Sequence, residues 1–393
     1  MEAHALRSPA VGDGSGESAQ SAVAYLVVVR KGPSWDQADL EPYCRLLSRR
    51  FVGEVWAFGS YEADAVIGRM RLRVVREHDM RDLANRLRFY LRARVWVRDL
   101  RAAHPRGLVF VALEPFAGGL VALYAARRTQ SPLVCEVNGV YASRHNIANT
   151  RMALLRPLRV LARRLVGTFV LRRAAAVRLL FPDQLRGFAR LPERVISQQF
   201  FETTNLAAFH PGPEERIILG VGFPFRVKGF DLLCQAFRAI SSRHPEWKLV
   251  LIGYRVPQEV HERGLEHPRI EVYPGLKQPQ VAEWMARCAI FALPSRTEAM
   301  GRVLLEAATA GKCRVAARVD GIPTVIEDGV DGVLIDPERV DQLAAALDRL
   351  MGDSGLRHHL GEAARSRVMR EFSEEAYLEH YAELVSAALR GRA

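Results

Sequence analysis

The most constraining feature of this sequence is an alternation between short apolar runs and longer amphipathic segments, which extends over most of its 393 residues. Short runs rich in Val, Ile and Leu are typical of buried strands, and the segments between them have helical periodicity. Regular alternation of strands and helices favours parallel sheets covered by helices on both faces, so we expect an α/β fold. A chain of this length exceeds one ordinary core and predicts two domains.

The expected elements form two successive sets. In the first half, strands are expected at residues 24–29, 54–58, 72–75, 108–113, 133–137 and 195–196, and very basic helical patterns cover residues 82–103 and 151–178. In the second half, strands are expected at residues 216–221, 248–252, 270–273, 290–293, 314–316 and 332–335, with helices at 230–242, 278–287, 301–310 and 340–351. Each set suffices for one Rossmann-like, doubly wound domain.

The domain boundary is expected where the sequence His-Pro-Gly-Pro-Glu at residues 210–214 precedes a fresh strand. We therefore expect an N-terminal domain over residues 23–210, a C-terminal domain over residues 211–372, and a final helix over residues 373–393 with Ser373 as its N-cap. Residues 1–22 are small and polar without the basic-then-apolar order of a secretory signal, and we expect a disordered tail. Two doubly wound domains predict a ligand between them, at the carboxyl ends of their strands.

The positive charge of the chain is concentrated in its first half. Residues 1–200 contain 32 Lys and Arg against 17 Asp and Glu, a net charge of +15, although the whole chain carries +12. This asymmetry suggests an anionic partner, with a solvated basic surface as the alternative. Leucines interleaved with arginines in residues 151–178 suggest contact with an anionic membrane surface. No nucleic-acid partner is expected, because no recognised nucleic-acid motif is visible.

The cysteines and the hydropathy indicate a cytoplasmic protein. Five cysteines are widely spaced without a C-x-x-C pair, which argues against a disulfide framework or a zinc site and favours small buried side chains in a reducing compartment. No uncharged apolar run is long enough for a transmembrane helix of about 18 or more residues. We expect a cytoplasmic location, with peripheral association at the inner face of the membrane as a further option.

The strongest candidate site lies where the sequence Pro-Ser-Arg-Thr-Glu-Ala-Met-Gly at residues 294–301 joins an expected strand to an expected helix. The loop carries Glu298, Gly301 opens the helix, and Glu306 follows on it. Free N–H groups and the positive dipole end of the helix would bind a diphosphate, and glycine lets a phosphate approach the backbone. Glu306 could then accept hydrogen bonds from ribose hydroxyls, and Glu298 would face the leaving group or the sugar.

A second candidate motif, Arg-Val-Lys-Gly-Phe-Asp at residues 226–231, follows the first strand of the same half. Its two cations, Arg226 and Lys228, could neutralise a nucleotide diphosphate from the opposite side. Each motif alone is a common surface feature. Their joint placement after two strands of one doubly wound domain is what favours a nucleotide-diphosphate site.

Together these motifs resemble the family 4 retaining glycosyltransferases of GT-B fold. The resemblance covers about residues 215–340 and is carried by V-K-G-F-D-L-L at 227–233, E-A-M-G-R-V-L-L-E-A at 298–307 and D-G-I-P-T-V-I-E-D-G-V-D-G-V-L-I at 320–335. It implies two Rossmann-like domains facing across a cleft, with a nucleotide-sugar donor in the C-terminal domain and an acceptor in the N-terminal domain. It also implies that the final helix packs back on the N-terminal domain.

The resemblance further implies roles for individual residues. Glu298 and Glu306 are the acids of an E-x7-E motif, with Glu298 near the reacting end of the donor sugar. Lys228 would stabilise the departing nucleotide, so Glu298 and Lys228 are the expected catalytic residues. The expected donor-binding residues are Arg226, Lys228, Glu298, Met300, Gly301, Arg302, Val303 and Glu306. The donor would be a UDP- or GDP-sugar, and no cofactor or metal is expected, because cations and a helix dipole stabilise the leaving group.

Several positions depart from the family pattern, including the segments 31–35 and 202–205 and two single residues at the expected site. Phe223 stands where the family usually has an arginine, and Asn138 stands where it often has a histidine. Asn138 can still hydrogen-bond a sugar hydroxyl, although it cannot take up a proton at neutral pH. Asn138 and Gly139 are therefore candidate acceptor residues. Glu114, which follows a buried strand, is a third candidate, with a structural turn as its alternative.

The expected function is transfer of a hexosyl group from a nucleotide-diphosphate sugar to an acceptor hydroxyl with retention of configuration. A sugar or lipid-linked acceptor in cell-envelope polysaccharide or glycolipid synthesis is expected. The alternatives are a glycosyltransferase of secondary-metabolite synthesis, another GT-B enzyme such as a sugar phosphorylase or epimerase, and a non-catalytic GT-B nucleotide-binding protein.

Overall fold

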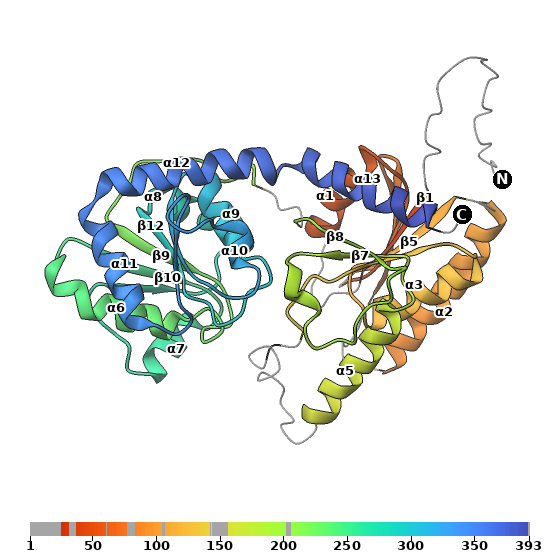
Figure 1. Cartoon of the computed structure of the whole chain (residues 1–393), viewed down its shortest axis with the longest axis horizontal. Helices are drawn as coiled ribbons and strands as arrows, with labels where there is room; N and C mark the ends of the chain where they lie inside the picture. Colours follow the sequence, from red (N-terminus) through yellow and green to blue (C-terminus); the bar gives the residue numbers. More distant parts are fainter. Residues whose placement is uncertain are drawn as a thin grey trace, which may run out of the picture.

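The computed structural model describes residues 25–30, 37–59, 61–76, 83–103, 107–141, 143, 156–201 and 206–391. Within these ranges the chain forms two α/β domains, each built on its own sheet (Figure 1). The predicted α/β class with two Rossmann-like domains is confirmed. The tail expected at residues 1–22 lies outside the described residues.

The N-terminal domain is built on strands β1 (Tyr25–Arg30), β2 (Val52–Gly59), β3 (Ala63–Ile67), β4 (Met70–Arg76), β5 (Leu108–Ala112), β6 (Leu133–Glu136), β7 (Ala176–Leu179) and β8 (Ile196–Gln199). They lie in the order β3-β4-β2-β1-β5-β6-β7-β8. The β3–β4 pair is antiparallel, whereas the other described neighbours are parallel. The central order from β4 to β7 is that of a doubly wound domain, with the reversal of chain order between β1 and β5.

Two strands of this sheet differ from the sequence-based expectation. The edge strand β3 was not predicted, because its side chains are largely exposed and Val66 is 75% accessible. The prediction of helix through residue 178 was wrong, because the helix ends at Leu171 and β7 follows it. The charged residue in β7, Arg178, is fully buried in the sheet, which an apolar-run criterion does not anticipate.

Helices cover both faces of the N-terminal sheet. Helices α2 (Leu83–Ala103), α3 (Ala117–Arg128) and α5 (Arg156–Leu171) pack on one face. Helices α1 (Gln37–Ser48) and α13 (Glu374–Arg390) pack on the other face (Figure 1). The sheet core is therefore completed by the last helix of the chain.

The C-terminal sheet contains strands β9 (Ile217–Val221), β10 (Lys248–Ile252), β11 (Ile270–Tyr273), β12 (Ile290–Leu293), β13 (Cys313–Ala317) and β14 (Val333–Ile335). Their order is β11-β10-β9-β12-β13-β14, and all pairs are parallel. Every strand expected in this half is present, with ends that differ by at most a residue. The chain order reverses between β9 and β12, and ligands of such sheets bind outside the carboxyl ends at this point.

The helices of the C-terminal domain connect these parallel strands. They are α6 (Phe230–Ile240), α7 (Val256–Glu262), α8 (Gln278–Arg287), α9 (Arg302–Thr309), α10 (Ile322–Val325), α11 (Val340–Gly352) and α12 (Ser354–Glu371), with a 3-10 turn η3 (Ser241–Arg243). Helix α12 packs on α9 and β13. No described helix is long and apolar enough to cross a membrane.

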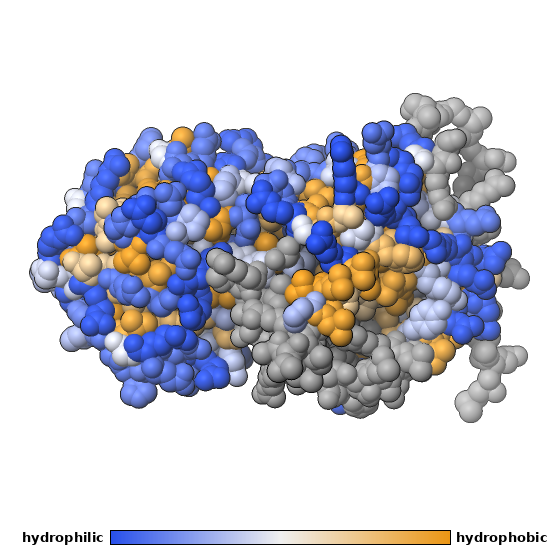
Figure 2. Space-filling view, turned by 60° about the horizontal axis from the view of Figure 1, so that its bottom comes forward, coloured by the Kyte–Doolittle hydropathy of each residue, from blue (hydrophilic) through white to orange (hydrophobic). Residues whose placement is uncertain are grey.

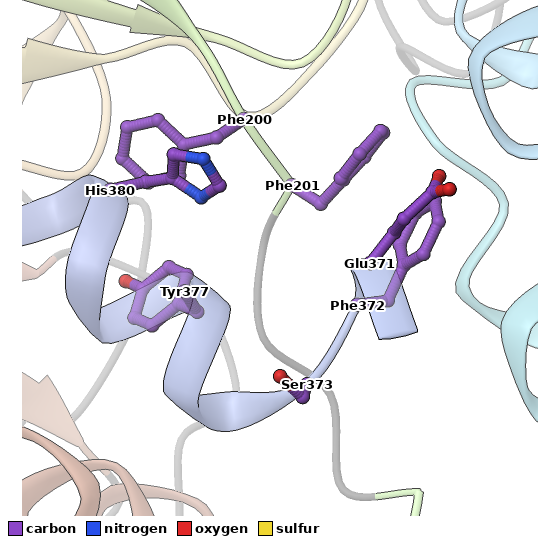
Figure 3. Close-up of a pocket in the computed structure, with 7 residues that line it drawn as sticks. All are labelled: Phe200, Phe201, Glu371, Phe372, Ser373, Tyr377 and His380. Carbon is purple, nitrogen blue, oxygen red and sulfur yellow. The ribbon is translucent and has the colours of Figure 1, made fainter. Parts of the chain in front are cut away.

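The chain passes between the domains twice, after β8 and between α12 and α13. Ser373 lies at the second crossing, where its Oγ accepts a hydrogen bond from the N–H of Ala376 at 3.2 Å. The two crossings meet in an aromatic cluster, in which the rings of Phe201 and Phe372 have centroids 4.0 Å apart. Phe200 stacks on His380 at 5.7 Å in the same cluster (Figure 3).

The carboxyl ends of the two sheets face each other. Leu180 and Phe181, which follow β7, belong to a core cluster that otherwise consists mainly of C-terminal-domain residues. A Cβ on Gly321, which follows β13, would lie 3.0 Å from the ring of Phe181. The loops that follow the strands therefore meet between the domains. The five cysteines are buried, as predicted for small side chains of the core.

We expect Leu384→Ala to lower the free energy of unfolding by about 2–5 kcal/mol, because Leu384 on α13 is fully buried against the N-terminal sheet. Denaturant unfolding measures this change. The neighbouring Glu383 is exposed, so Glu383→Ala should stay within about 0.5 kcal/mol of the wild type. Equal effects of the two substitutions would contradict the packing of α13 described above.

Candidate active site

Three loops meet at the carboxyl edge of the C-terminal sheet, after the neighbouring strands β9, β12 and β13. The N–H of Arg296 donates to the carbonyl of Val227 at 2.8 Å, which joins the first two loops. The N–H of Gly321 donates to the carbonyl of Glu298 at 3.1 Å, which joins the second and third. The three loops thus form one hydrogen-bonded frame at the topological switch point.

Glycine is required where the first two loops touch. Gly229 has φ +69°, and a Cβ at this position would lie 1.9 Å from the carbonyl oxygen of Pro294. No side chain can be accommodated at that distance, and the left-handed backbone also favours glycine. The glycine of the Val-Lys-Gly motif therefore allows the backbones of the two loops to come into contact.

The side chain of Arg296 ties the same loops together. Its two terminal nitrogens donate to the two carboxylate oxygens of Asp231 at 2.8 and 2.9 Å, and Nη1 also donates to the carbonyl of Arg226 at 2.6 Å. Its Nε donates to Glu338 at 2.8 Å. Only 6% of the Arg296 side chain is accessible. The rigid guanidinium fork therefore positions the Arg226–Lys228 segment against the Glu298 loop.

Asp320 holds the Glu298 loop from the other side. Its Oδ2 accepts hydrogen bonds from the hydroxyl of Thr297 at 2.6 Å and from the N–H of Glu298 at 3.1 Å. Asp320 itself has φ +43°, a backbone conformation that aspartate tolerates better than most residues. The backbone of Glu298 is therefore bound on both its N–H and its carbonyl side.

This frame brings Lys228 and Glu298 into direct contact. The ammonium of Lys228 forms an ion pair with Oε2 of Glu298, and each side chain is about 15% accessible. The stem of Lys228 packs against Gly222, where a Cβ would lie 2.8 Å from Cε. Two residues 70 positions apart thus form a partly buried pair. Arg226, by contrast, is exposed.

The start of α9 lies next to this pair. Gly301 precedes the helix with φ +75°, and its carbonyl accepts the N–H of Leu304 at 2.7 Å. The N–H groups of Arg302 and Val303 belong to the first turn, where no acceptor within the helix exists. The side chain of Met300 is buried in the core, so Met300 can contribute only backbone atoms to a donor site.

Glu306 lies in the second turn of α9. It is partly buried, and burial raises the pKa of its carboxyl group from 4.5 to about 7, with Arg302 opposing the shift. A carboxylate that is held in poorly solvated surroundings is costly to maintain for stability alone. Such perturbed groups are concentrated at functional sites.

The candidate acceptor residues of the N-terminal domain make structural contacts. Nδ2 of Asn138 donates to the carbonyl of Leu113 at 3.0 Å and to Glu136 at 3.2 Å, while its Oδ1 accepts from Arg178. Arg178 and Glu136 form a buried ion pair at 2.5 Å. The amide of Asn138 is thus already engaged on both sides. Arg178 was not among the predicted site residues, because a charged residue is rarely expected inside a buried strand.

Glu114 and Gly139 lie in the same region. The Glu114 carboxylate accepts the N–H of Phe116 at 3.1 Å and of Gly118 at 2.5 Å, so it caps the start of α3. This contact favours the structural alternative for Glu114. The carbonyl of Gly139 accepts a hydrogen bond from Gln184 at 3.4 Å. The contact of these residues with an acceptor stays a prediction.

An aromatic cluster adjoins these residues at the carboxyl edge of the N-terminal sheet. The rings of Phe116 and Tyr141 have centroids 4.8 Å apart in an edge-to-face contact. Phe188 lies 6.5 Å from Phe116 and 6.4 Å from Tyr141. The carboxyl edge of the N-terminal sheet is therefore partly aromatic.

The chain is similar to known glycosyltransferases in sequence. Residues 203–367 match the family Glycosyl transferases group 1. A D-inositol 3-phosphate glycosyltransferase of Xylanimonas cellulosilytica is 33% identical over 168 residues, 41% of this chain and 40% of that protein. An alpha-D-kanosaminyltransferase of Streptomyces kanamyceticus is 28% identical over 226 residues, 52% of this chain and 58% of that protein. The matches thus span about half the length of these curated relatives.

Solved structures match over nearly the whole chain. Sucrose-phosphate synthase from Thermosynechococcus elongatus has a TM-score of 0.70 at 18% identity and covers 94% of this chain and 99% of its own. HepE of Anabaena, in complex with UDP and glucose, has a TM-score of 0.69 at 16% identity and covers 93% of this chain and 100% of its own. The protein therefore has the GT-B fold.

We expect Glu306→Gln to stabilise the fold at about pH 8 and not at about pH 4. The pKa of Glu306 is higher in the folded protein than in the unfolded chain. The free energy of unfolding of the wild type therefore falls as the pH rises from 4.5 to about 7. Above that range, ionisation of Glu306 in the folded state lowers the stability of the wild type by up to about 3 kcal/mol. Denaturant unfolding across this pH range measures the difference. A constant difference at all pH values would contradict a perturbed Glu306.

We expect Arg296→Lys to lower the free energy of unfolding by about 2–3 kcal/mol, because an ammonium cannot reproduce the buried fork to Asp231 and Arg226. The matched control is Arg287→Lys, which alters the exposed two-point pair with Glu215. This change should stay below about 1 kcal/mol. Comparable losses in the two variants would show that the loop frame does not depend on Arg296.

Proposed function

We propose that the protein is a glycosyltransferase that moves a hexosyl group from a UDP- or GDP-sugar to an acceptor hydroxyl with retention of configuration. The observation that carries this proposal is the Lys228–Glu298 pair beside the first turn of α9. The arrangement combines a cation, free backbone N–H groups and a carboxylate at the switch point of a doubly wound sheet.

The donor diphosphate would lie over the start of α9. The N–H groups of Arg302 and Val303 and the positive end of the helix dipole would bind its oxygens. The ammonium of Lys228 would neutralise the charge that develops on the departing nucleotide, which is the transition-state interaction expected to matter most. Glu306, further along the same helix, would accept hydrogen bonds from the ribose hydroxyls.

Glu298 would orient the sugar next to the leaving group. Its backbone is fixed by Asp320 and Gly321, and its side chain by Lys228. A side chain held in this way can keep hydroxyl groups of the sugar in a reactive geometry. For a retaining reaction we propose attack from the face of the leaving group, with the departing phosphate taking the proton of the acceptor hydroxyl.

Phe223 supports a modified phosphate site. Its ring is 48% exposed and packs edge-to-face on Tyr254 at 5.3 Å. Phenylalanine therefore stands where the family usually has an arginine cation. Lys228 and the exposed Arg226 are then the cations that the first loop offers. The proposal requires no metal ion and no cofactor, because these charges and the helix start stabilise the leaving group.

The N-terminal domain would bind the acceptor, and we propose a role in cell-envelope polysaccharide or glycolipid synthesis. Support comes from the fold likeness to a lipopolysaccharide outer core galactosyltransferase, WaaB, with a TM-score of 0.66 at 14% identity and coverage of 93% of this chain and 99% of its own. The sequence likeness to the kanosaminyltransferase favours a second candidate, the glycosylation of a secondary metabolite.

The proposal is tested by a thermal-shift screen over UDP- and GDP-sugars, followed by donor-hydrolysis and transfer assays. We expect Lys228→Ala and Glu298→Gln to lower kcat about 100- to 1000-fold, because each removes charge stabilisation or orientation in the transition state. We expect a stabilising shift with the true donor in the wild type.

The chain contains a matched control pair. Lys248 and Glu271 form a similar ion pair at 3.0 Å on neighbouring strands of the same sheet. Lys248 begins β10 and lies at the edge opposite the loop frame. Lys248→Ala and Glu271→Gln should leave turnover near the wild-type value. Wild-type turnover in Lys228→Ala and Glu298→Gln would refute the proposed site, and nucleotide binding without turnover in the wild type would favour a non-catalytic protein.

A further inference from the structure

Helix α5 exposes a row of large apolar side chains. Leu158, Leu161, Leu165 and Phe169 are 64%, 51%, 62% and 40% accessible. Their spacing of three and four residues places them on one face of the helix. Single exposed leucines are common on protein surfaces, but a continuous apolar row indicates an interaction site.

The row belongs to a larger helical layer. Helix α3 contacts both α5 and α2, and Figure 1 shows the three helices side by side on one face of the N-terminal sheet. The outer sides of α2 and α3 add three further exposed apolar residues, Leu91, Val95 and Leu120, at 48%, 44% and 42%. Figure 2 shows hydrophobic side chains gathered on this domain beside hydrophilic ones.

Exposed arginines accompany the apolar row. On α5 and the turn that follows it they include Arg164, Arg172 and Arg173, and the described parts of α2 and α3 add Arg92, Arg94, Arg98, Arg101, Arg127 and Arg128. The sequences of the three helices contain one acid, Asp99. The guanidinium carbon of Arg173 lies 3.8 Å over the ring of Phe169. Long arginine stems can thus cover apolar surface while their charged ends reach outward.

We propose that the outer face of α5, with α3 and α2 beside it, docks on an anionic lipid surface. The leucines of α5 would enter the boundary between headgroups and acyl chains, and the arginines would lie at the level of the lipid phosphates. A second copy of this chain fits less well, because pairing these faces would bring arginines against arginines. A nucleic acid would use the charge but would leave the leucine row exposed.

The docking face adjoins the acceptor side of the site. Gly167 of α5 lies where a Cβ would be 2.4 Å from the ring of Phe188 and 3.3 Å from that of Phe116. The guanidinium carbon of Arg163 lies 5.7 Å over Phe116. Helix α5 therefore has the aromatic cluster of the N-terminal domain behind it. If the proposed function holds, this placement favours an acceptor that is presented by the lipid surface.

The test is co-sedimentation of the full chain with phosphatidylglycerol vesicles and with neutral phosphatidylcholine vesicles, without any nucleotide sugar. We expect clear binding to the anionic vesicles only. Arg164→Gln with Arg172→Gln should weaken this binding about 25-fold, or about fivefold per arginine. Leu161→Ser with Leu165→Ser should weaken it at least about tenfold, because two inserted side chains are lost. These residues are exposed, so both double variants should retain the wild-type melting temperature.

A matched control variant removes one exposed arginine and one exposed apolar residue elsewhere. Arg349 on α11 and Met369 on α12 are both exposed, and Arg349→Gln with Met369→Ser should bind vesicles like the wild type. Equal binding of wild type to neutral and anionic vesicles, or an unchanged affinity in both α5 variants, would overturn the proposal. A loss of dimer instead of vesicle binding in the leucine variant would assign the face to a second copy.

The result is independent of the proposed catalytic function. Vesicle binding needs no donor, so it can fail in an active enzyme, and it can succeed in a protein that transfers no sugar. Donor hydrolysis should be unchanged in the α5 variants, because none of the substituted residues belongs to the loop frame. Transfer to a lipid-presented acceptor, compared with a soluble sugar acceptor, then measures whether the docking face contributes to turnover.

Discussion

The candidate site depends on the contact between two loops, in which Gly229 touches the carbonyl of Pro294 and Arg296 binds both Asp231 and the carbonyl of Arg226. These contacts place Lys228 next to Glu298, although neither residue belongs to a regular element. A buried guanidinium with satisfied donors is a rigid connector. The chemistry proposed for the site therefore rests on an interaction that touches no substrate. The same frame includes Asp320, so three strands contribute to one fixed arrangement at the switch point.

The two domains differ in how their charges are used. In the C-terminal domain the buried arginines Arg296 and Arg314 are neutralised by carboxylates, and they position backbone and side chains. In the N-terminal domain the exposed arginines of α2, α3 and α5 are accompanied by few acids. Arginines paired with carboxylates hold loops in a fixed geometry, whereas exposed arginines with few acids around them attract an anionic surface. The proposed division between a donor domain and an acceptor domain is consistent with this difference.

The sequence was sufficient for the strands of the C-terminal domain, because they are short and mainly apolar, and the central strands β9 and β12 are fully buried. It was insufficient for β3, whose side chains are exposed, and for β7, whose Arg178 is neutralised by a partner from another strand. The Glu298–Glu306 and Lys228 motifs were identified from their joint placement after two strands and from the family resemblance. The roles of Arg296 and Asp320 could not be predicted in this way, because they depend on loops that approach only after the sheet forms. The hydrogen bond from Arg178 to Asn138 could not be predicted either, because it joins residues that are distant in the sequence.

The position of α13 has a consequence for the order in which the two domains can fold. Tyr381 and Leu384 help to complete the core on one face of the first domain, yet they follow the whole second domain in the sequence. Domains generally fold as they are synthesised, beginning at the N-terminus. Here one face of the first sheet, which α1 covers only in part, stays incomplete until the second domain has been made. The time for which the first domain exposes this apolar surface during synthesis is thus set by the length of the domain that follows it.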